Sequence, residues 1–321
     1  MTIDYKVDAD GIATITWAMQ DVPMNVLNGQ SIPAFADAVK RAQADSAVKG
    51  VVVTSSKPEF IAGADLNMML AITDVAGMMD FVTQLHALMR GIEKSGKPFV
   101  AALNGTTLGG GYEVALACHR RIAADNPKAK IGLPEIMVGI FPGAGGTTRL
   151  VRKMGAMMAA PYLLEGKLSD PKGAKAGGLI DEVVPADQLL ARAKEWVLAA
   201  TDADLVKPWD AKGYKMPGGT PYHPAGFMTF VGASAMVHGK TMGVYPAAKA
   251  LLAAVYEGAL VPFDTALKIE ARHFTSVLMN PSSTAMIRSL FINKEALEKG
   301  ANRPKVADQS VKKLGVIGAG M

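Results

Sequence analysis

The feature that most constrains the fold is a pair of continuous apolar runs, GVVVTSS at residues 50–56 and PFVAAL at residues 98–103. A strand with one face in water alternates apolar and polar residues, so unbroken runs are typical of strands buried on both faces. The pattern between the two runs predicts a helix at about residues 73–94. Strand, helix and strand in this order predict an α/β fold with a largely parallel sheet.

The segments on either side extend this architecture. Residues 2–17 read as two alternating strands joined by a hairpin turn at Asp10-Gly11. Residues 31–44 place apolar side chains at helical spacing. Beyond the second run we expect a short strand in LIDEVV, a long surface loop over residues 201–226, and helices at about 156–165, 170–177, 186–199, 246–258, 263–278 and 282–298.

Two glycine-containing turns follow the two buried strands. The first, FIAGADL, comes after the strand at residues 50–56, and the second contains Gly109, Gly110 and Gly111 and opens a helix. Amides in the first turn of a helix lack intrahelical acceptors, and the helix dipole there favours negative charge. Loops at the carboxyl ends of neighbouring parallel strands meet in one crevice. We therefore expect amides from both turns to converge on one oxygen, which is the geometry of an oxyanion hole.

Two glutamates stand in unusual surroundings. Glu113 lies at the start of the helix that follows the glycine turn, and Glu135 lies further on, in GLPEIMVG. Their neighbours in the sequence are apolar residues and glycines, whereas most other glutamates of the chain lie among charged residues. A carboxyl group in apolar surroundings has a raised pKa and can exchange a proton near neutral pH. The pair is therefore the best candidate for acid–base catalysis.

Several other kinds of site are not supported. The five histidines show no H-x-x-H or H-E-x-x-H spacing, so we predict no metal site. The absence of G-x-S-x-G excludes the nucleophile elbow of α/β-hydrolases. The single cysteine, Cys118, excludes an internal disulfide and a thiolate metal cage, which is typical of a reduced, cytoplasmic protein.

Charge and composition narrow the range of partners. The formal net charge is +5, and the basic surplus lies in the second and third parts of the chain. Such a surplus suits an anionic ligand. Aromatic residues are only 6% of the chain and are not interleaved with a basic run, so nucleic acid is not favoured. We find neither a transmembrane segment nor a secretory signal in the sequence.

The last residues differ in kind from the rest. VKKLGVIGAGM at residues 311–321 is a short β-type run that leads into Gly318 and Gly320, the opening of a G-x-G-x-x-G dinucleotide fingerprint. The third glycine, the helix and the ribose-binding acid do not follow. We therefore expect a longer polypeptide whose next domain begins here, and we expect no NAD binding by these residues alone.

Three motifs in order carry a resemblance to a known family. FIAGADL, NGTTLGGGYEVALAC and LPEIMVGIFPGAGGTTRL resemble the crotonase (enoyl-CoA hydratase/isomerase) superfamily over roughly residues 1–200. The rest of the chain, through STAMIRSLFINKEALEKG and KKLGVIGAGM, resembles the multifunctional fatty-acid oxidation α-chain. In such chains a hydratase/isomerase domain precedes a 3-hydroxyacyl-CoA dehydrogenase.

The resemblance implies a fold and a division of the chain. The fold is α/β, a ClpP/crotonase-like core of ββα repeats followed by a helical extension. Residues 1–200 would be the enoyl-CoA hydratase/isomerase domain, and residues 201–310 a loop and helical linker. Residues 311–321 would be the first strand and the start of a Rossmann NAD-binding domain, which is truncated here.

The resemblance also implies roles for single residues. The backbone amides of Ala64 and Gly110 would form the oxyanion hole for the thioester oxygen. Glu113 and Glu135 would hold the water that adds to the double bond, and Glu135 would exchange the proton at the α-carbon. The loop at about residues 57–66 would border the nucleotide end of coenzyme A, with the binding residues Lys57, Ala62, Asp65 and Leu66.

The activity implied is hydration of trans-2-enoyl-CoA to 3-hydroxyacyl-CoA in fatty-acid β-oxidation, together with 3-enoyl-CoA isomerisation. The CoA thioester would be the substrate, no cofactor would act in this chain, and NAD would serve the longer polypeptide. A thiolase β-subunit is the partner that the resemblance suggests, and a homo-oligomer stays open. Two alternatives remain: an enzyme that is mainly an isomerase, and an acyl-CoA-binding or assembly module without activity of its own.

Overall fold

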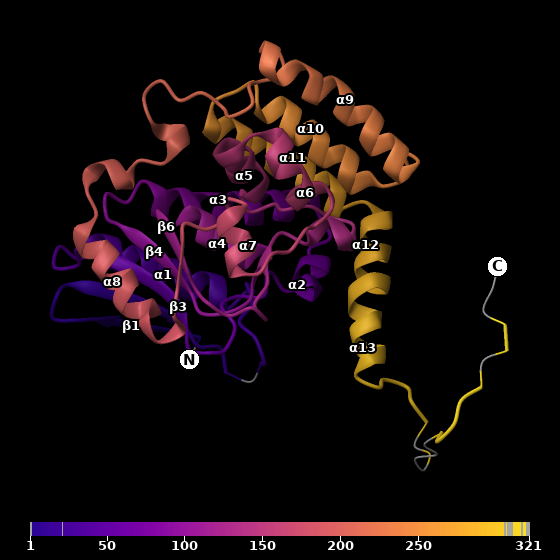
Figure 1. Cartoon of the computed structure of the whole chain (residues 1–321), viewed down its shortest axis with the longest axis horizontal. Coiled ribbons are helices and arrows are strands. Elements are labelled where there is room, and N and C mark those ends of the chain that lie inside the picture. Colours follow the sequence, from indigo (N-terminus) through magenta and orange to yellow (C-terminus); the bar gives the residue numbers. More distant parts are fainter. Residues whose placement is uncertain (1, 21, 305, 307–310, 316, 319–321) are drawn as a thin grey trace.

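The computed structural model describes residues 2–20, 22–304, 306, 311–315 and 317–318 (Figure 1). Its main sheet has the strand order β1-β2-β3-β4-β6-β8. β1 runs antiparallel to β2, and the other neighbouring pairs are parallel. The strands are β1 (Ile3–Val7), β2 (Ile12–Trp17), β3 (Gly50–Ser55), β4 (Phe99–Leu103), β6 (Arg120–Ala124) and β8 (Glu182–Val184).

Both faces of this sheet are buried, as the unbroken apolar runs predict. In β3, Val51 and Val53 pack into the larger core with α1, α3 and α4, whereas Val52 lies on the opposite face under α8. The helices of the sheet domain are α1 (Ser31–Ala44), α2 (Leu66–Ala71), α3 (Val75–Glu93), α4 (Gly110–Ala117), α5 (Gly146–Met154), α6 (Ala156–Leu164), α7 (Pro171–Ala176) and α8 (Leu189–Ala199), with short helical turns η1 (Glu135–Val138) and η2 (Ala186–Gln188).

A second, small ladder holds the loops that leave the main sheet. Its strands β5 and β7 are parallel, and single bridges join Ile61 to Thr107 and Leu27 to Ala64. The loops after β3 and β4 therefore lie side by side, at the carboxyl ends of parallel strands where ligand sites form. The two strands are β5 (Thr107–Leu108) and β7 (Ile131–Gly132).

The extension is a helical layer over one end of the sheet domain (Figure 1). α11 packs on α3 and α5, α10 packs on α11, and α12, η5 and α13 continue down the side of the molecule. Its elements are η3 (Asp202–Leu205), η4 (Pro208–Asp210), α9 (Pro224–Thr241), α10 (Pro246–Gly258), α11 (Phe263–Leu278), α12 (Pro281–Ile287), the π-helical η5 (Arg288–Asn293) and α13 (Lys294–Glu298). In the described part of the chain, no helix has both the length and the apolar character that crossing a membrane requires.

Among the elements that were not predicted are α9, α2 and β6. α9 begins inside the expected loop, and its sequence lacks a polar face, so periodicity gives no signal there. α2 begins inside another expected loop, where the Asp65 side chain accepts hydrogen bonds from Asn67 N and Met68 N and caps the helix. β6 begins with Arg120 and Arg121, which mask its strand character.

The expected strand near the end is not formed by the described residues 311–315, 317 and 318. A single β-type run needs a neighbouring strand to accept and donate its backbone hydrogen bonds. Gly318 has a φ of 71° outside any helix or strand, and Gly320 lies outside the described residues. The assignment of this segment to a NAD-binding domain stays a prediction.

Candidate active site

A cavity of about 460 Å³ lies where the two ladder-held loops meet the extension. Its wall includes both predicted glutamates and the predicted amide-bearing residues: Ala64, Gly110, Glu113 and Glu135. Most of the remaining lining is apolar, and it comes from the turns and η1 as well as from α2, α3, α11 and η5. A largely apolar cavity with a few converging polar groups is the usual form of a small-molecule site.

Two backbone amides lie close together in the wall of this cavity. A Cβ built on Gly110 would lie 3.7 Å from Ala64 N, so the two peptides are close neighbours. Among the backbone hydrogen bonds of the described residues, neither Ala64 N nor Gly110 N donates to a protein acceptor. The turn depends on Gly109, whose φ of 52° and ψ of −127° disfavour any residue with a side chain. Both amides are thus free to donate to a ligand oxygen.

Backbone amides at the start of α5 fix the carboxyl group of Glu113. Glu113 is only 3% exposed, and its Oε1 accepts hydrogen bonds from Ala144 N at 2.8 Å and from Gly146 N at 2.7 Å. Burial raises the pKa of Glu113 well above its ordinary value, the neighbouring carboxyl groups of Glu135 and Glu270 add to the rise, and the two amides oppose it. Hydrogen bonds from two N–H donors stabilise the ionised form of a carboxyl group. At the same burial, Glu113 is therefore more easily ionised than a carboxyl group without such donors.

Glu135 has the contrasting environment. It begins η1, and its Oε1 lies 2.8 Å from where a Cβ on Gly109 would stand. Its Oε2 is buried and has no hydrogen-bond partner among the described residues. Burial, with a smaller contribution from Glu270, raises the pKa of Glu135 to about 8. A carboxyl group in this position is protonated at neutral pH and can donate its proton to a ligand.

Comparison with known proteins gives this arrangement a family. The model of one family, described as enoyl-CoA hydratase/isomerase, matches residues 8–204. The chain belongs to the enoyl-CoA hydratase/isomerase family. The predictions of this family and of its α/β fold are confirmed, and the predicted hydratase or isomerase activity is supported at the level of the family.

Its curated relatives are much longer than this chain. The fatty acid oxidation complex subunit alpha of Shewanella halifaxensis is 37% identical over 313 residues, which are 97% of this chain and 44% of the relative. The subunit of the same name from Idiomarina loihiensis is 36% identical, over 98% of this chain and 44% of the relative. The chain thus spans less than half the length of these proteins.

Solved structures support the crotonase-type fold of this enoyl-CoA hydratase/isomerase family member. The human mitochondrial delta3-delta2-enoyl-CoA isomerase covers 94% of this chain with a TM-score of 0.67 at 23% identity, and all of that structure is matched. An enoyl-CoA hydratase from Bacillus halodurans covers 90% of this chain with a TM-score of 0.65 at 20% identity, and again the whole structure is matched. At these identities the likeness concerns the fold.

Of the four residues predicted to bind coenzyme A, two line the cavity and two do not. Ala62 and Leu66 line the cavity. Lys57 and Asp65 are not part of its lining: the Lys57 ammonium donates to the Val22 carbonyl, and Asp65 caps α2. The roles of all four in binding remain predictions.

The contribution of the extension to this cavity was not predicted from the sequence. Leu290, Phe291 and Lys294, from η5 and the start of α13, complete its lining. Glu270 on α11, which is 1% exposed and lies behind the catalytic wall, was not predicted either. Helical spacing offers a signal for Glu270, because Ala266, Leu267, Ala271 and Phe274 on the same face of α11 are all buried.

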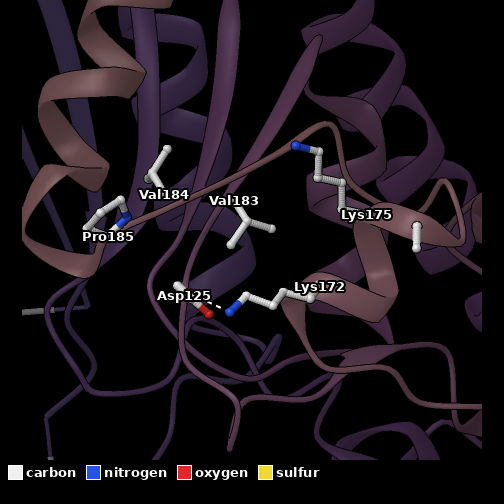
Figure 2. A pocket seen from close by; sticks show the side chains of 7 residues that line it. Asp125, Lys172, Lys175, Val183, Val184 and Pro185 are labelled. Atoms are coloured by element: carbon white, nitrogen blue, oxygen red, sulfur yellow. Dashed lines mark ion pairs between the residues drawn. The ribbon is translucent and has the colours of Figure 1, made fainter.

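A different hollow lies beside the edge strand β8, and Figure 2 shows its lining. Lys172 Nζ pairs with Asp125 Oδ2 at 2.9 Å, whereas Lys175 points away from that pair. This hollow contains no buried acid. No cluster of three or more metal-ligating side chains occurs among the residues that the structure describes.

Proposed function

We propose that the chain is an enoyl-CoA hydratase that adds water across trans-2-enoyl-CoA to give 3-hydroxyacyl-CoA. One observation carries the proposal: two buried carboxyl groups, Glu113 and Glu135, share a cavity with two free amides, Ala64 N and Gly110 N. A member of the enoyl-CoA hydratase/isomerase family needs an electrophile at the thioester oxygen and acid–base groups near the double bond.

The amides would act on the thioester. When Ala64 N and Gly110 N donate to the thioester oxygen, they withdraw electron density from the conjugated double bond and activate C3 toward water. As water adds, negative charge accumulates on that oxygen, and the amides stabilise it without having to reorient. Gly110 also lies in the first turn of α4, where the helix dipole favours negative charge.

The two glutamates would divide the proton transfers. Glu113, with two amide donors on Oε1, is the ionised member and removes a proton from the attacking water. Glu135, with an unpartnered Oε2, is the protonated member and donates its proton to C2. One proton enters the pair and another leaves it, so their total charge is unchanged by hydration.

Isomerisation of 3-enoyl-CoA is a second activity that the same wall could support. It requires removal of a proton from C2 and its return at C4, with the enolate held by the same amides. Glu135, here in its ionised form, is the group proposed to take the proton from C2 and to return it at C4, because its Oε2 is free of protein donors.

The binding of coenzyme A and the wider context are also proposed. Ala62 and Leu66 line the cavity, and Lys294 adds a cation that suits the phosphates of coenzyme A; Lys57 and Asp65 would border its nucleotide. The relatives' name, fatty acid oxidation complex subunit alpha, supports a role in fatty-acid oxidation within a larger assembly. The cytoplasm is the location that we propose from the sequence. A thiolase partner and a NAD-dependent second step would belong to that assembly, whereas this chain itself would need no cofactor.

The test is the loss of enoyl-thioester ultraviolet absorbance when the purified chain meets a short trans-2-enoyl-CoA. We expect turnover in the wild type and a loss of at least about a hundredfold in Glu113→Gln and in Glu135→Gln, with CoA-ester binding retained. Near-normal turnover in both variants would contradict the site. Binding without turnover in the wild type would favour the acyl-CoA-binding module, and turnover of a cis-3-enoyl-CoA alone would favour an isomerase.

A further inference from the structure

One turn of the chain stands between two buried carboxylates. Over residues 144–146 successive amides point to alternate sides: Ala144 N and Gly146 N donate to Glu113 Oε1, whereas Gly145 N donates to Glu270 Oε1 at 2.6 Å. The amides that hold Glu113 thus belong to a segment that a second carboxylate holds from behind.

The contacts of Glu270 continue into α5. Thr148 donates to Glu270 Oε2 through its backbone N at 2.7 Å and through its Oγ1 at 2.6 Å. Three donors from the turn and the first residues of α5 therefore converge on this one carboxylate. Glu270 itself lies on α11, in the extension and far along the chain from the glycine turn.

Other side chains fix the same turn. His86 Nε2, on α3, lies 2.8 Å from Gly143 O and 3.8 Å from Glu270 Oε1. Arg149 Nη1, on α5, donates to Ala144 O at 3.2 Å. The carbonyl groups of Gly143 and Ala144 thus contact His86 and Arg149, whereas the amides of the turn donate to the carboxyl groups of Glu113 and Glu270.

We propose that Glu270 is a positioning residue of the active site, which holds residues 144–148 so that Ala144 N and Gly146 N stay directed at Glu113. The inference rests on the proposed function of Glu113 as the base. Glu270 does not line the cavity, so it acts through the turn and not on the substrate. Through Glu270, the extension would help to position the catalytic group Glu113.

A carboxylate suits this position better than a neutral side chain. A buried charge is costly unless it is hydrogen-bonded, and three donors meet that need here. Glutamine has the same shape but one acceptor oxygen, and its amide hydrogens would face at least one of these donors. The substitution Glu270→Gln therefore loosens the turn while it keeps the volume of the side chain.

The charge of Glu270 provides a separate readout. The titratable and charged groups around it are His86 on α3, Glu113 on α4, Glu135 in η1 and Arg149 on α5. The negative charge of Glu270 raises the pKa of Glu135. Hydration requires protonated Glu135, so removal of this charge should move the alkaline limb of the kcat profile to lower pH.

The experiment compares wild type, Glu270→Gln and the control Glu257→Gln in the same hydration assay. Glu257 is a glutamate of the extension that pairs with Arg272 and His273 on the surface of the layer. We expect Glu270→Gln to lower kcat by about 10- to 100-fold, since a small misplacement of a catalytic group costs that much, with KM nearly unchanged. The alkaline limb should shift to lower pH in Glu270→Gln only.

A second pair of variants covers the case in which Glu270→Gln does not fold. Thr148→Val removes one hydrogen bond to Glu270 and leaves the charge in place, so kcat should fall several-fold without a shift of the alkaline limb. Thr148→Ser keeps a hydroxyl at this position, so its kcat should stay close to that of the wild type. Wild-type kcat in Glu270→Gln, or in Thr148→Val when Glu270→Gln is unfolded, would overturn the inference. A wild type without turnover would instead contradict the proposed function, and the inference with it.

Discussion

Two apolar cavities of similar size differ in what their walls can do. The cavity with Glu113 and Glu135 measures about 460 Å³, and another of about 540 Å³ lies between α6, α9 and α10. Glutamates line both cavities, but their pKa values shift in opposite directions. Burial raises the pKa of Glu135 to about 8, whereas a hydrogen bond from Lys240 lowers the pKa of the exposed Glu165 at the rim of the larger cavity.

Volume and apolar lining alone therefore do not make a catalytic site in this fold. Helices form the wall of the larger cavity, and the backbone polar groups inside a helix are paired within it. Turns that leave the sheet form much of the wall of the smaller cavity, and turns present free amides and buried acids to the interior. The following predictions test this comparison.

The largest effect on turnover is expected at the amides. In Gly110→Ala the new Cβ would clash with Leu27 Cδ1, the end of a side chain that can shift, and it would fill the space beside Ala64 N. We expect kcat for hydration to fall by about 10²- to 10³-fold while the protein remains folded. Steady-state kinetics with thermal unfolding as a control would measure this, and unchanged kcat would remove the amides from the mechanism.

The next effect is a dependence on pH. The raised pKa of Glu135 means that its active, protonated form is present below about pH 8 and is lost as the pH rises through that value. We expect kcat for hydration to fall about tenfold per pH unit on the alkaline side. A stopped-flow profile in overlapping buffers would show it. A flat profile from pH 7 to well above 8 would contradict the role of Glu135 as the acid.

A substitution in the larger cavity should change stability and not turnover. Leu251 of α10 is buried in its wall, so Leu251→Ala should lower the free energy of unfolding by about 2–5 kcal/mol. We expect kcat per folded molecule to stay close to that of the wild type. Urea unfolding beside the hydration assay measures both quantities, and a large fall in kcat would show that the two cavities are coupled.

The smallest effect is expected at the rim of the larger cavity. Glu165 pairs with Lys240 at 2.6 Å, but both side chains are more than half exposed. Glu165→Gln should therefore leave kcat and the alkaline limb unchanged. This variant is the matched control for Glu135→Gln, because both replace a glutamate that lines an apolar cavity. A loss of turnover in both variants would show that the wall of the larger cavity also contributes to catalysis.

The sheet was predictable because its strands carry their own signal. The runs at β3 and β4 are apolar throughout, and the glycine turns follow them directly. The two glutamates were predictable as a pair for the same reason, since their apolar neighbours in the sequence lie beside them in the structure. β6 was not predicted because its first two residues are arginines, which interrupt the apolar pattern of a buried strand.

Three helical segments of the extension were predicted, at 246–258, 263–278 and 282–298, but α9 and the contribution of the extension to the cavity were not, and the physical reason is different. α9 shows apolar side chains on all sides, so its sequence has no stripe to read. Glu270 lies on the apolar face of α11, although Lys268 and Arg272 stand on either side of it in the sequence. Helical spacing therefore indicates its burial, whereas its contacts with Gly145 and Thr148 appear only in the structure. Contacts between segments far apart in sequence leave little trace in either segment alone.

The position of Glu270 bears on where this protein can be divided. The family match ends at residue 204, and a natural choice of fragment would end there as well. Such a fragment would keep every residue that faces the cavity from the sheet domain, but it would leave the amides of Gly145 and Thr148 without the carboxylate that receives them. The family match thus defines a unit that ends at residue 204, whereas the hydrogen bonds that support Glu113 define a larger unit that includes α11.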